Sequence, residues 1–234
     1  MNILAIDTTG KTASIAIVSR NTPTCAIKVN AEMFINNGLT HSNTLLPMVD
    51  SLLPMADIGM GDIDYIALSA GPGSFTGLRI GAALAKGLCF GLGAKIVPVS
   101  TLDALAYNVA NWGGVIIPIM DARREQVYTA LYSSVGGIIK HESDYMACHI
   151  DQIISLVKDS KKAAVFLGDG VDIHKEKLMD LGFAIAPGHL ALQRAASVGC
   201  IALGIADESA IDAAEFEPFY IRPSQAARLA AQKL

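Results

Sequence analysis

One stretch of the sequence decides how the chain folds, and it reads Ser69-Ala70-Gly71-Pro72-Gly73-Ser74-Phe75-Thr76-Gly77-Leu78-Arg79-Ile80-Gly81. The apolar residues 65–68 that precede it indicate a short buried strand. The glycines on either side of Pro72 suit a tight turn with unusual backbone angles. Ser74 or Thr76 then offers a side-chain oxygen that can cap a helix. The stretch therefore predicts a strand, a glycine loop and a helix N-terminus, a geometry that attracts anions.

The glycine loop leaves two interpretations open. It lacks the Lys-Ser or Lys-Thr pair that ends a Walker loop. Its glycines Gly71, Gly73 and Gly77 are spaced G-x-G-x-x-x-G, one residue longer than the dinucleotide fingerprint. The loop either holds an anion at the helix N-terminus or only lets the strand and the helix pack closely.

The helix predicted after the loop, residues 78–92, is apolar or small at nearly every position, and its only charged residues are Arg79 and Lys86. A helix that is apolar all round is either buried or shared between its own core and a partner. Its fifteen residues are too few to span a membrane. We therefore interpret this helix as a protein interface.

Small residues form a row on the same helix at Gly77, Gly81 and Ala85. Each glycine costs about 0.8–1 kcal/mol of helix stability relative to alanine, so the row indicates that something packs directly on the helix backbone. We expect that something to be a partner. Gly81→Leu should then block the partner and leave the monomer folded.

Composition limits the classes of function. Of the 234 residues, 52% are apolar and 17% are charged, which indicates a globular protein with apolar surface that another chain covers. The net charge of −4 argues against independent, tight binding to nucleic acid. The four cysteines contain no C-x-x-C pair, so neither a zinc site nor a disulfide framework is expected. No basic leader or transmembrane-length segment is evident, and we expect a cytoplasmic protein.

The opening of the chain predicts a strand at residues 3–6, a hairpin partner at 12–18 and a third strand at 24–29. The turn Asp7-Thr8-Thr9 presents a carboxylate and two hydroxyl groups. These groups either face a nucleotide phosphate or its metal, or they bind the amides of their own turn.

The second half repeats this order. An apolar strand at residues 115–121 ends in Asp121, as the first strand ends in Asp7, and an alternating strand returns at 126–132. The turn-rich residues 111–114 mark a boundary between subdomains spanning 1–110 and 111–234. The pattern predicts a duplicated α/β fold with two mixed sheets flanked by helices.

No catalytic set is visible. The sequence lacks G-x-S-x-G, H-E-x-x-H, H-x-x-x-H and S-x-x-K motifs, and its histidines show no metal-ligand spacing. A second amphipathic helix follows His41 over residues 45–53, and it contains Pro47. His41 has no second histidine at helical spacing, because Leu45 stands there, so we interpret it as a capping or interface residue.

Several segments resemble the TsaB family along the whole chain. They are residues 3–8, 39–48, 71–81, 121–128 and 218–222, of which the glycine segment is the most specific. The resemblance implies a non-catalytic member of the actin/Hsp70/sugar-kinase superfamily. It also implies a role in forming the threonylcarbamoyladenosine (t6A) modification of tRNA, in which a TsaB subunit pairs with the catalytic paralogue TsaD and the ATPase TsaE joins them.

The resemblance also implies partners and site residues. TsaD uses a metal held partly by an H-x-x-x-H pair, whereas this chain has only His41 of that pair, so we expect a scaffold without catalytic residues, metal or intrinsic cofactor. ATP or ADP is expected at the interface of the complex, tRNA only through the complex, and a homodimer in isolation. The expected partner interface comprises His41, Leu45, Leu46, Met48, Val49, Leu52, Leu53, Leu78, Arg79, Gly81, Ala82, Ala85, Lys86 and Cys89. Vestigial phosphate loops are expected at Asp7, Thr8, Thr9, Gly71, Gly73 and Ser74.

Two other classes of function remain open. One is an independent enzyme, a degenerate kinase of the superfamily or a glycoprotease. The other is a regulatory homodimer that acts without TsaD.

Overall fold

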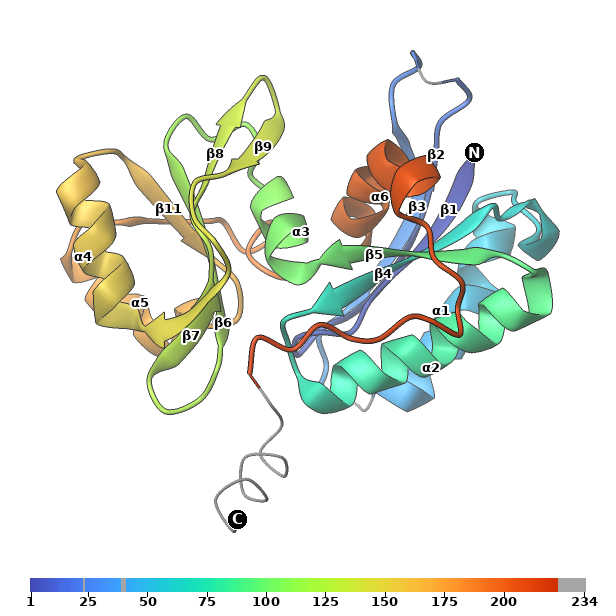
Figure 1. Ribbon diagram of the computed structural model, residues 1–234, viewed down its shortest axis with the longest axis horizontal. Helices are drawn as coiled ribbons and strands as arrows, with labels where there is room; N and C mark the ends of the chain where they lie inside the picture. Colours follow the sequence, from blue (N-terminus) through green and yellow to red (C-terminus); the bar gives the residue numbers. More distant parts are fainter. Residues whose placement is uncertain (23, 39–40, 223–234) are drawn as a thin grey trace, which may run out of the picture.

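Two β-sheets organise the chain into two subdomains that lie side by side (Figure 1). The structure is a computed structural model, and it describes residues 1–22, 24–38 and 41–222. Each sheet combines antiparallel strands with parallel ones, so both sheets are mixed.

The first sheet has the strand order β3-β2-β1-β4-β5. Its strands are β1 (Asn2–Asp7), β2 (Ala13–Ser19), β3 (Lys28–Ile35), β4 (Tyr65–Gly71) and β5 (Lys95–Ser100). β1, β2 and β3 pair antiparallel, whereas β1, β4 and β5 pair parallel. Central strands such as β1 and β4 are almost entirely buried because helices cover both faces of the sheet.

Alternating side chains of β1 enter two different cores. Leu4 and Ile6 pack with helices α1 (His41–Met55) and α2 (Phe75–Leu92) on one face of the sheet. Ile3 and Ala5 pack on the other face with α6 (Ala195–Ser209). This two-residue period is what positions α1 and α2 side by side on one surface of the subdomain.

The second sheet repeats the pattern in the order β10-β7-β6-β11-β12. Its strands are β6 (Val115–Asp121), β7 (Gln126–Thr129), β10 (Met146–His149), β11 (Ala164–Leu167) and β12 (Ala184–Ile185), with a hairpin of β8 (Tyr132–Val135) and β9 (Ile138–His141) that joins through β6. Helices α4 (Ile150–Ser160) and α5 (Val171–Asp180) cover one face. A short 3₁₀ helix (Met60–Asp62) precedes β4. The repeated strand order confirms the predicted duplicated α/β fold with two mixed sheets flanked by helices.

The chain does not divide into consecutive subdomains as the sequence predicted. Helix α3 (Thr101–Tyr107) precedes the predicted boundary, yet Leu102 and Leu105 pack on the second sheet. Helix α6 lies beyond that boundary, yet it packs on the first sheet. The assignment of all of 111–234 to a second subdomain therefore needs correction, because the chain crosses between the sheets twice.

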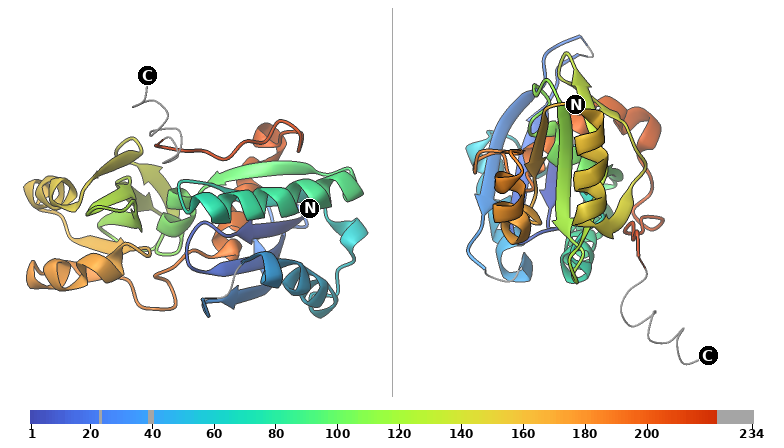
Figure 2. Two further views of the ribbon diagram at one scale, coloured as in Figure 1. Left: turned by 90° about the horizontal axis from the view of Figure 1, so that it is seen from below. Right: turned by 90° about the vertical axis from the view of Figure 1, so that its left-hand side faces the viewer.

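A C-terminal strap, residues 211–222, also returns to the first subdomain and runs alongside α2 (Figures 1 and 2). It begins with a bridge between Ile211 and Ile96 of β5, and Phe216 inserts into the core beneath α2. Phe219 N then donates to Ala70 O at 2.7 Å, and Arg222 reaches Ala147 O of the second subdomain at 3.3 Å. The strap therefore spans both subdomains.

Candidate partner interface

The glycine loop closes onto the turn between β1 and β2. Ser74 caps α2, since its Oγ accepts a hydrogen bond from Gly77 N at 3.2 Å. Its own N–H donates to Thr9 O at 2.7 Å. A Cβ atom on Gly73 would lie 2.6 Å from Thr9 O. The loop thus allows strand and helix to pack closely, which was one of the two interpretations.

The predicted phosphate-binding groups of the β1–β2 turn bind one another. Asp7 Oδ1 accepts hydrogen bonds from Thr9 N at 2.9 Å and from Thr9 Oγ1 at 2.7 Å, and Ser69 Oγ donates to Asp7 Oδ2. Thr8 Oγ1 donates to Gly77 O at 2.8 Å. Asp7 is fully buried, and burial raises the pKa of its carboxyl group. The structure therefore brings Asp7, Thr8, Thr9, Gly73 and Ser74 together, but it turns the carboxylate and both hydroxyls inward.

Most of the expected interface side chains lie in the core. Ten of the fourteen are buried, and they are Leu45, Met48, Val49, Leu52, Leu53, Leu78, Gly81, Ala82, Ala85 and Cys89. They form the layer between α1, α2 and the first sheet. The apolar face of each helix thus meets its own sheet, and a direct contact of these ten residues with a partner stays a prediction. Leu46 (50% exposed), Arg79, Lys86 and the partly exposed His41 remain at the surface.

Gly77 and Gly81 face Thr8 of the β1–β2 turn, and Ala85 is buried in the first core. A Cβ on Gly81 would lie 2.5 Å from Thr8 Oγ1 and 3.2 Å from Leu68 Cδ1. The close neighbour predicted for these glycines thus exists, but it belongs to the same chain. The expectation that Gly81→Leu leaves the monomer folded is therefore wrong.

A second row of small residues faces outward on α2. Ala83, Gly87 and Gly91 are exposed, and no atom of the residues that the structure describes lies within 4 Å of a Cβ built on either glycine. Phe90, next to this row, is 93% exposed. We call these four residues the outer face of α2, and Ile80, Leu84 and Leu88 lie half-buried along its border. The spacing of four residues lets another backbone approach closely.

Helix α2 is longer than the sequence predicted. It spans 18 residues and is long and apolar enough, by length and composition, to cross a membrane. From the sequence we expected a helix of fifteen residues, too short to span a membrane, and that expected length is wrong. Six of its residues, including Gly77 and Gly81, are buried against the first subdomain.

His41 begins helix α1 and contacts the β1–β2 turn. Its Nε2 lies 3.1 Å from Gly10 O, and its Nδ1 is buried and has no hydrogen-bond partner within the described part of the chain. Leu45, one helical turn further, is buried in the core. Among residues 1–22, 24–38 and 41–222, no group of three or more His, Cys, Asp or Glu side chains is arranged to hold a metal ion.

Sequence reasoning missed the strap as a neighbour of α2. The Tyr220 ring lies 5.3 Å from the Phe75 ring, and the Arg79 guanidinium lies 3.9 Å from the same Phe75 ring. In the sequence, residues 218–222 served only as part of the family resemblance. An available signal was the aromatic pair Phe219-Tyr220, which is unusual in a chain with 6% aromatic residues.

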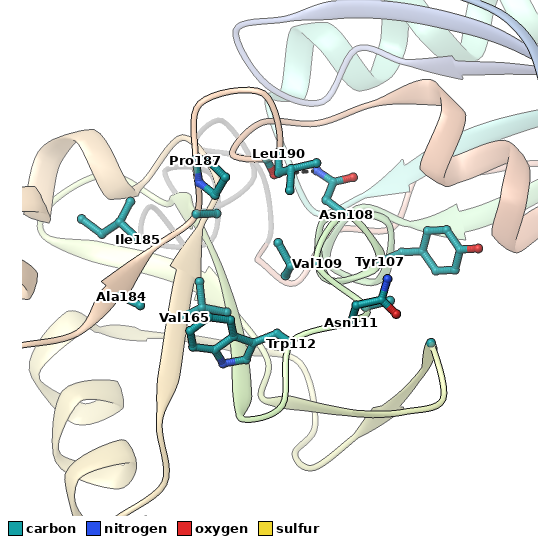
Figure 3. A pocket seen from close by; sticks show the side chains of 13 residues that line it. Tyr107, Asn108, Val109, Asn111, Trp112, Val165, Ala184, Ile185, Pro187 and Leu190 are labelled. Carbon is teal, nitrogen blue, oxygen red and sulfur yellow. Dashed lines mark hydrogen bonds between the residues drawn. The ribbon is translucent and has the colours of Figure 1, made fainter.

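A pocket of about 520 Å³ lies where the chain passes between the subdomains, and the sequence did not predict it (Figure 3). The end of α3 and the following turn line one side with Tyr107, Val109 and Trp112, and the residues around β12 line the other with Pro187. Its lining contains no charged side chain and none of the expected site residues.

The comparisons with known proteins agree with the fold. Residues 37–231 match the TsaD family, described as tRNA N6-adenosine threonylcarbamoyltransferase. YeaZ from Pseudomonas aeruginosa superimposes with a TM-score of 0.75 over 94% of this chain and 99% of its own, at 24% identity. The chain is thus related to TsaD by sequence, and it shares the fold of YeaZ.

Two curated relatives define the family more closely. The tRNA threonylcarbamoyladenosine biosynthesis protein TsaB of Bacillus subtilis (strain 168) is 37% identical over 181 residues, 77% of this chain and 76% of its own. The protein of the same name from Escherichia coli (strain K12) is 31% identical over 226 residues, 95% of both chains. The chain belongs to the TsaB family.

Proposed function

We propose that this chain is the accessory subunit of a t6A-forming complex and docks on TsaD through the outer face of α2 and the exposed residues of α1. The names of the TsaB relatives place those proteins in t6A biosynthesis. The observation that supports docking is the outward row Ala83, Gly87 and Gly91, because exposed glycines weaken a helix unless a partner uses the space above them. The exposed Phe90 and Leu46 add apolar area that a partner would cover.

The transfer step is assigned to TsaD and not to this chain. The polar groups of the β1–β2 turn are engaged with each other, and Leu45 occupies the position of a second metal-binding histidine. In this proposal TsaE joins the pair, ATP or ADP binds at the interface of the complex, and tRNA is held through the complex. The chain forms a homodimer when TsaD is absent, and it works in the cytoplasm.

Reconstitution tests the proposal. TsaD and TsaE from the same genome, tRNA, the threonylcarbamoyl donor system and ATP are incubated with and without this chain, and t6A is measured by mass spectrometry. We expect modification only when the chain and TsaD are both present. Modification by this chain without TsaD would establish the enzyme alternative, and full modification without the chain would favour the independent homodimer.

A pair of glycine variants locates the docking surface. Gly87→Leu fills the space above the outer face, whereas Gly204→Leu fills equally open space on α6, which packs on the opposite face of the first sheet. Both changes replace glycine by a better helix former, so both variants should stay folded. We expect Gly87→Leu alone to lose TsaD binding in size-exclusion chromatography. Equal binding by the two variants would exclude the outer face of α2.

A further inference from the structure

A groove of about 410 Å³ lies between α2 and the strap. Helix α2 contributes Arg79, Ala82, Ala83 and Lys86, and the strap contributes Phe216, Glu217, Pro218 and Tyr220. The lining thus combines two cationic side chains and one anionic side chain with apolar residues. The groove adjoins the outer face of α2, because Ala83 belongs to both.

The two cations of the groove are held in place without an ion-pair partner. The Arg79 guanidinium stacks 3.9 Å from the centre of the Phe75 ring, and Lys86 Nζ lies 3.5 Å from Ala214 O. Within residues 1–22, 24–38 and 41–222, neither side chain forms a salt bridge, although Glu217 lines the same groove. Stacking on an aromatic ring fixes the guanidinium plane and leaves its edge N–H groups free.

The strap, which forms one wall of the groove, is fixed to the first subdomain at two points. Phe216 is 2% exposed within the first core, and Phe219 N donates to Ala70 O at 2.7 Å. Phe219 O also packs directly against Gly71, where a side chain would collide with it. A wall fixed in this way does not have to be ordered when a partner binds, which favours affinity.

We propose that this groove receives one carboxylate side chain from the partner that docks on α2, with Arg79 as its principal donor. This inference rests on the proposed docking to TsaD and assigns a contact within it. A guanidinium fork binds a carboxylate through two parallel hydrogen bonds, and Lys86 adds a second positive charge. With Glu217 present, the lining carries a net charge of about +1, which suits a single carboxylate.

The charge of the chain argues against a nucleic-acid phosphate, and in favour of a carboxylate, as the group that binds in this groove. Its net charge is −4, and Glu217 lies beside the cations. Affinity for a phosphate backbone comes from several cations that act together. One stacked arginine next to an acid matches instead the arginine anchors that are enriched in protein interfaces.

The experiment compares the TsaD affinity of wild type, Arg79→Gln and Lys86→Gln by isothermal titration calorimetry at 50 and 300 mM NaCl. Arg124→Gln is the matched control, since Arg124 is an exposed arginine on the second subdomain. We expect Arg79→Gln to weaken binding about tenfold at low salt and to reduce the salt dependence. Lys86→Gln should have a smaller effect, and Arg124→Gln should match the wild type. Arg79→Lys, which keeps the charge but loses the fork, should fall between Arg79→Gln and wild type.

The outcomes separate the two proposals. Wild-type affinity and salt dependence in Arg79→Gln would overturn the groove contact and leave TsaD docking intact. Folded wild type that does not bind TsaD would overturn both. Arg79→Gln could instead leave TsaD binding unchanged and weaken the crosslinking of tRNA to this chain in the assembled complex. That result would show that the groove binds RNA, and it would also overturn the carboxylate assignment.

Discussion

Replacing Gly81 by alanine should destabilise the protein even though alanine is the better helix residue. The new Cβ would lie 2.5 Å from Thr8 Oγ1, which donates a buried hydrogen bond to Gly77 O. Overpacking costs about 1–3 kcal/mol. If the threonine side chain rotates away, the Gly77 carbonyl loses its donor, at a cost of about 1–3 kcal/mol. Rotation of the threonine relieves the overpacking, so only one of these costs applies, and subtracting the gain of about 1 kcal/mol in helix propensity leaves a loss of up to about 2 kcal/mol.

Gly87→Ala provides the opposite case on the same helix. No atom lies within 4 Å of its Cβ, so only the propensity gain of about 1 kcal/mol remains. Urea denaturation followed by circular dichroism should therefore show shifts of opposite sign for the two variants. If Gly81→Ala were as stable as Gly87→Ala, the assignment of the inner and outer rows of α2 would be refuted.

A double-mutant cycle identifies the cause of the Gly81 effect. Thr8→Ala removes the Oγ1 atom that the new Cβ would meet. Gly81→Ala should then cost less in the Thr8→Ala background than in the wild type. A coupling near zero would mean that the contact with Thr8 does not cause the loss.

Three further changes test the structure by urea unfolding. Burial raises the pKa of Asp169 to about 6 from an ordinary 3.8, so its contribution to stability is fully present below about pH 3.8 and is lost as the pH rises through about 6. Asp169→Asn should therefore gain about 2–3 kcal/mol relative to wild type between pH 4 and pH 8, and a pH-independent difference would contradict this. Asp103 Oδ1 accepts hydrogen bonds from Tyr132 at 2.7 Å and from Tyr145 at 3.0 Å, so Asp103→Ala should cost about 1–3 kcal/mol, and an unchanged midpoint would argue against this link between α3 and the second subdomain. Glu32 pairs with Arg194 and accepts from the backbone N of residue 196 at 3.1 Å, so Glu32→Ala should lower the unfolding midpoint, and Glu32→Gln should recover part of the loss.

The strands of the first sheet could be predicted because their residues carry the information locally. The apolar runs at β1 and β4 end at turn residues, and both strands lie close to their predicted positions. The third strand was predicted at residues 24–29 but spans Lys28–Ile35. As an edge strand it is only partly buried, so neither alternation nor a continuous apolar run marks its bounds.

The orientation of α2 could not be predicted because its sequence has no polar face. Glycines occur at Gly77 and Gly81 and again at Gly87 and Gly91, and hydrophobic periodicity does not distinguish the pair that contacts Thr8 from the pair that faces outward. Both helices that were expected to form the interface are apolar, as predicted. The apolar residues that were named on them, however, are mostly buried in the core of the first subdomain. Which face of the helix remains exposed is decided by tertiary packing, which the local sequence does not encode.

The positions of α6 and the strap have a consequence for how the chain is made. The first sheet is synthesised early. Residues 195–209, which pack on one face of that sheet, and residues 211–222, which form the second wall of the groove beside α2, are synthesised much later. The first subdomain therefore cannot complete its core while the chain is still short, unlike a protein that folds domain by domain during synthesis. The groove therefore has both of its walls only after residues 211–222 have been synthesised, and a partner that binds there would not bind a shorter nascent chain.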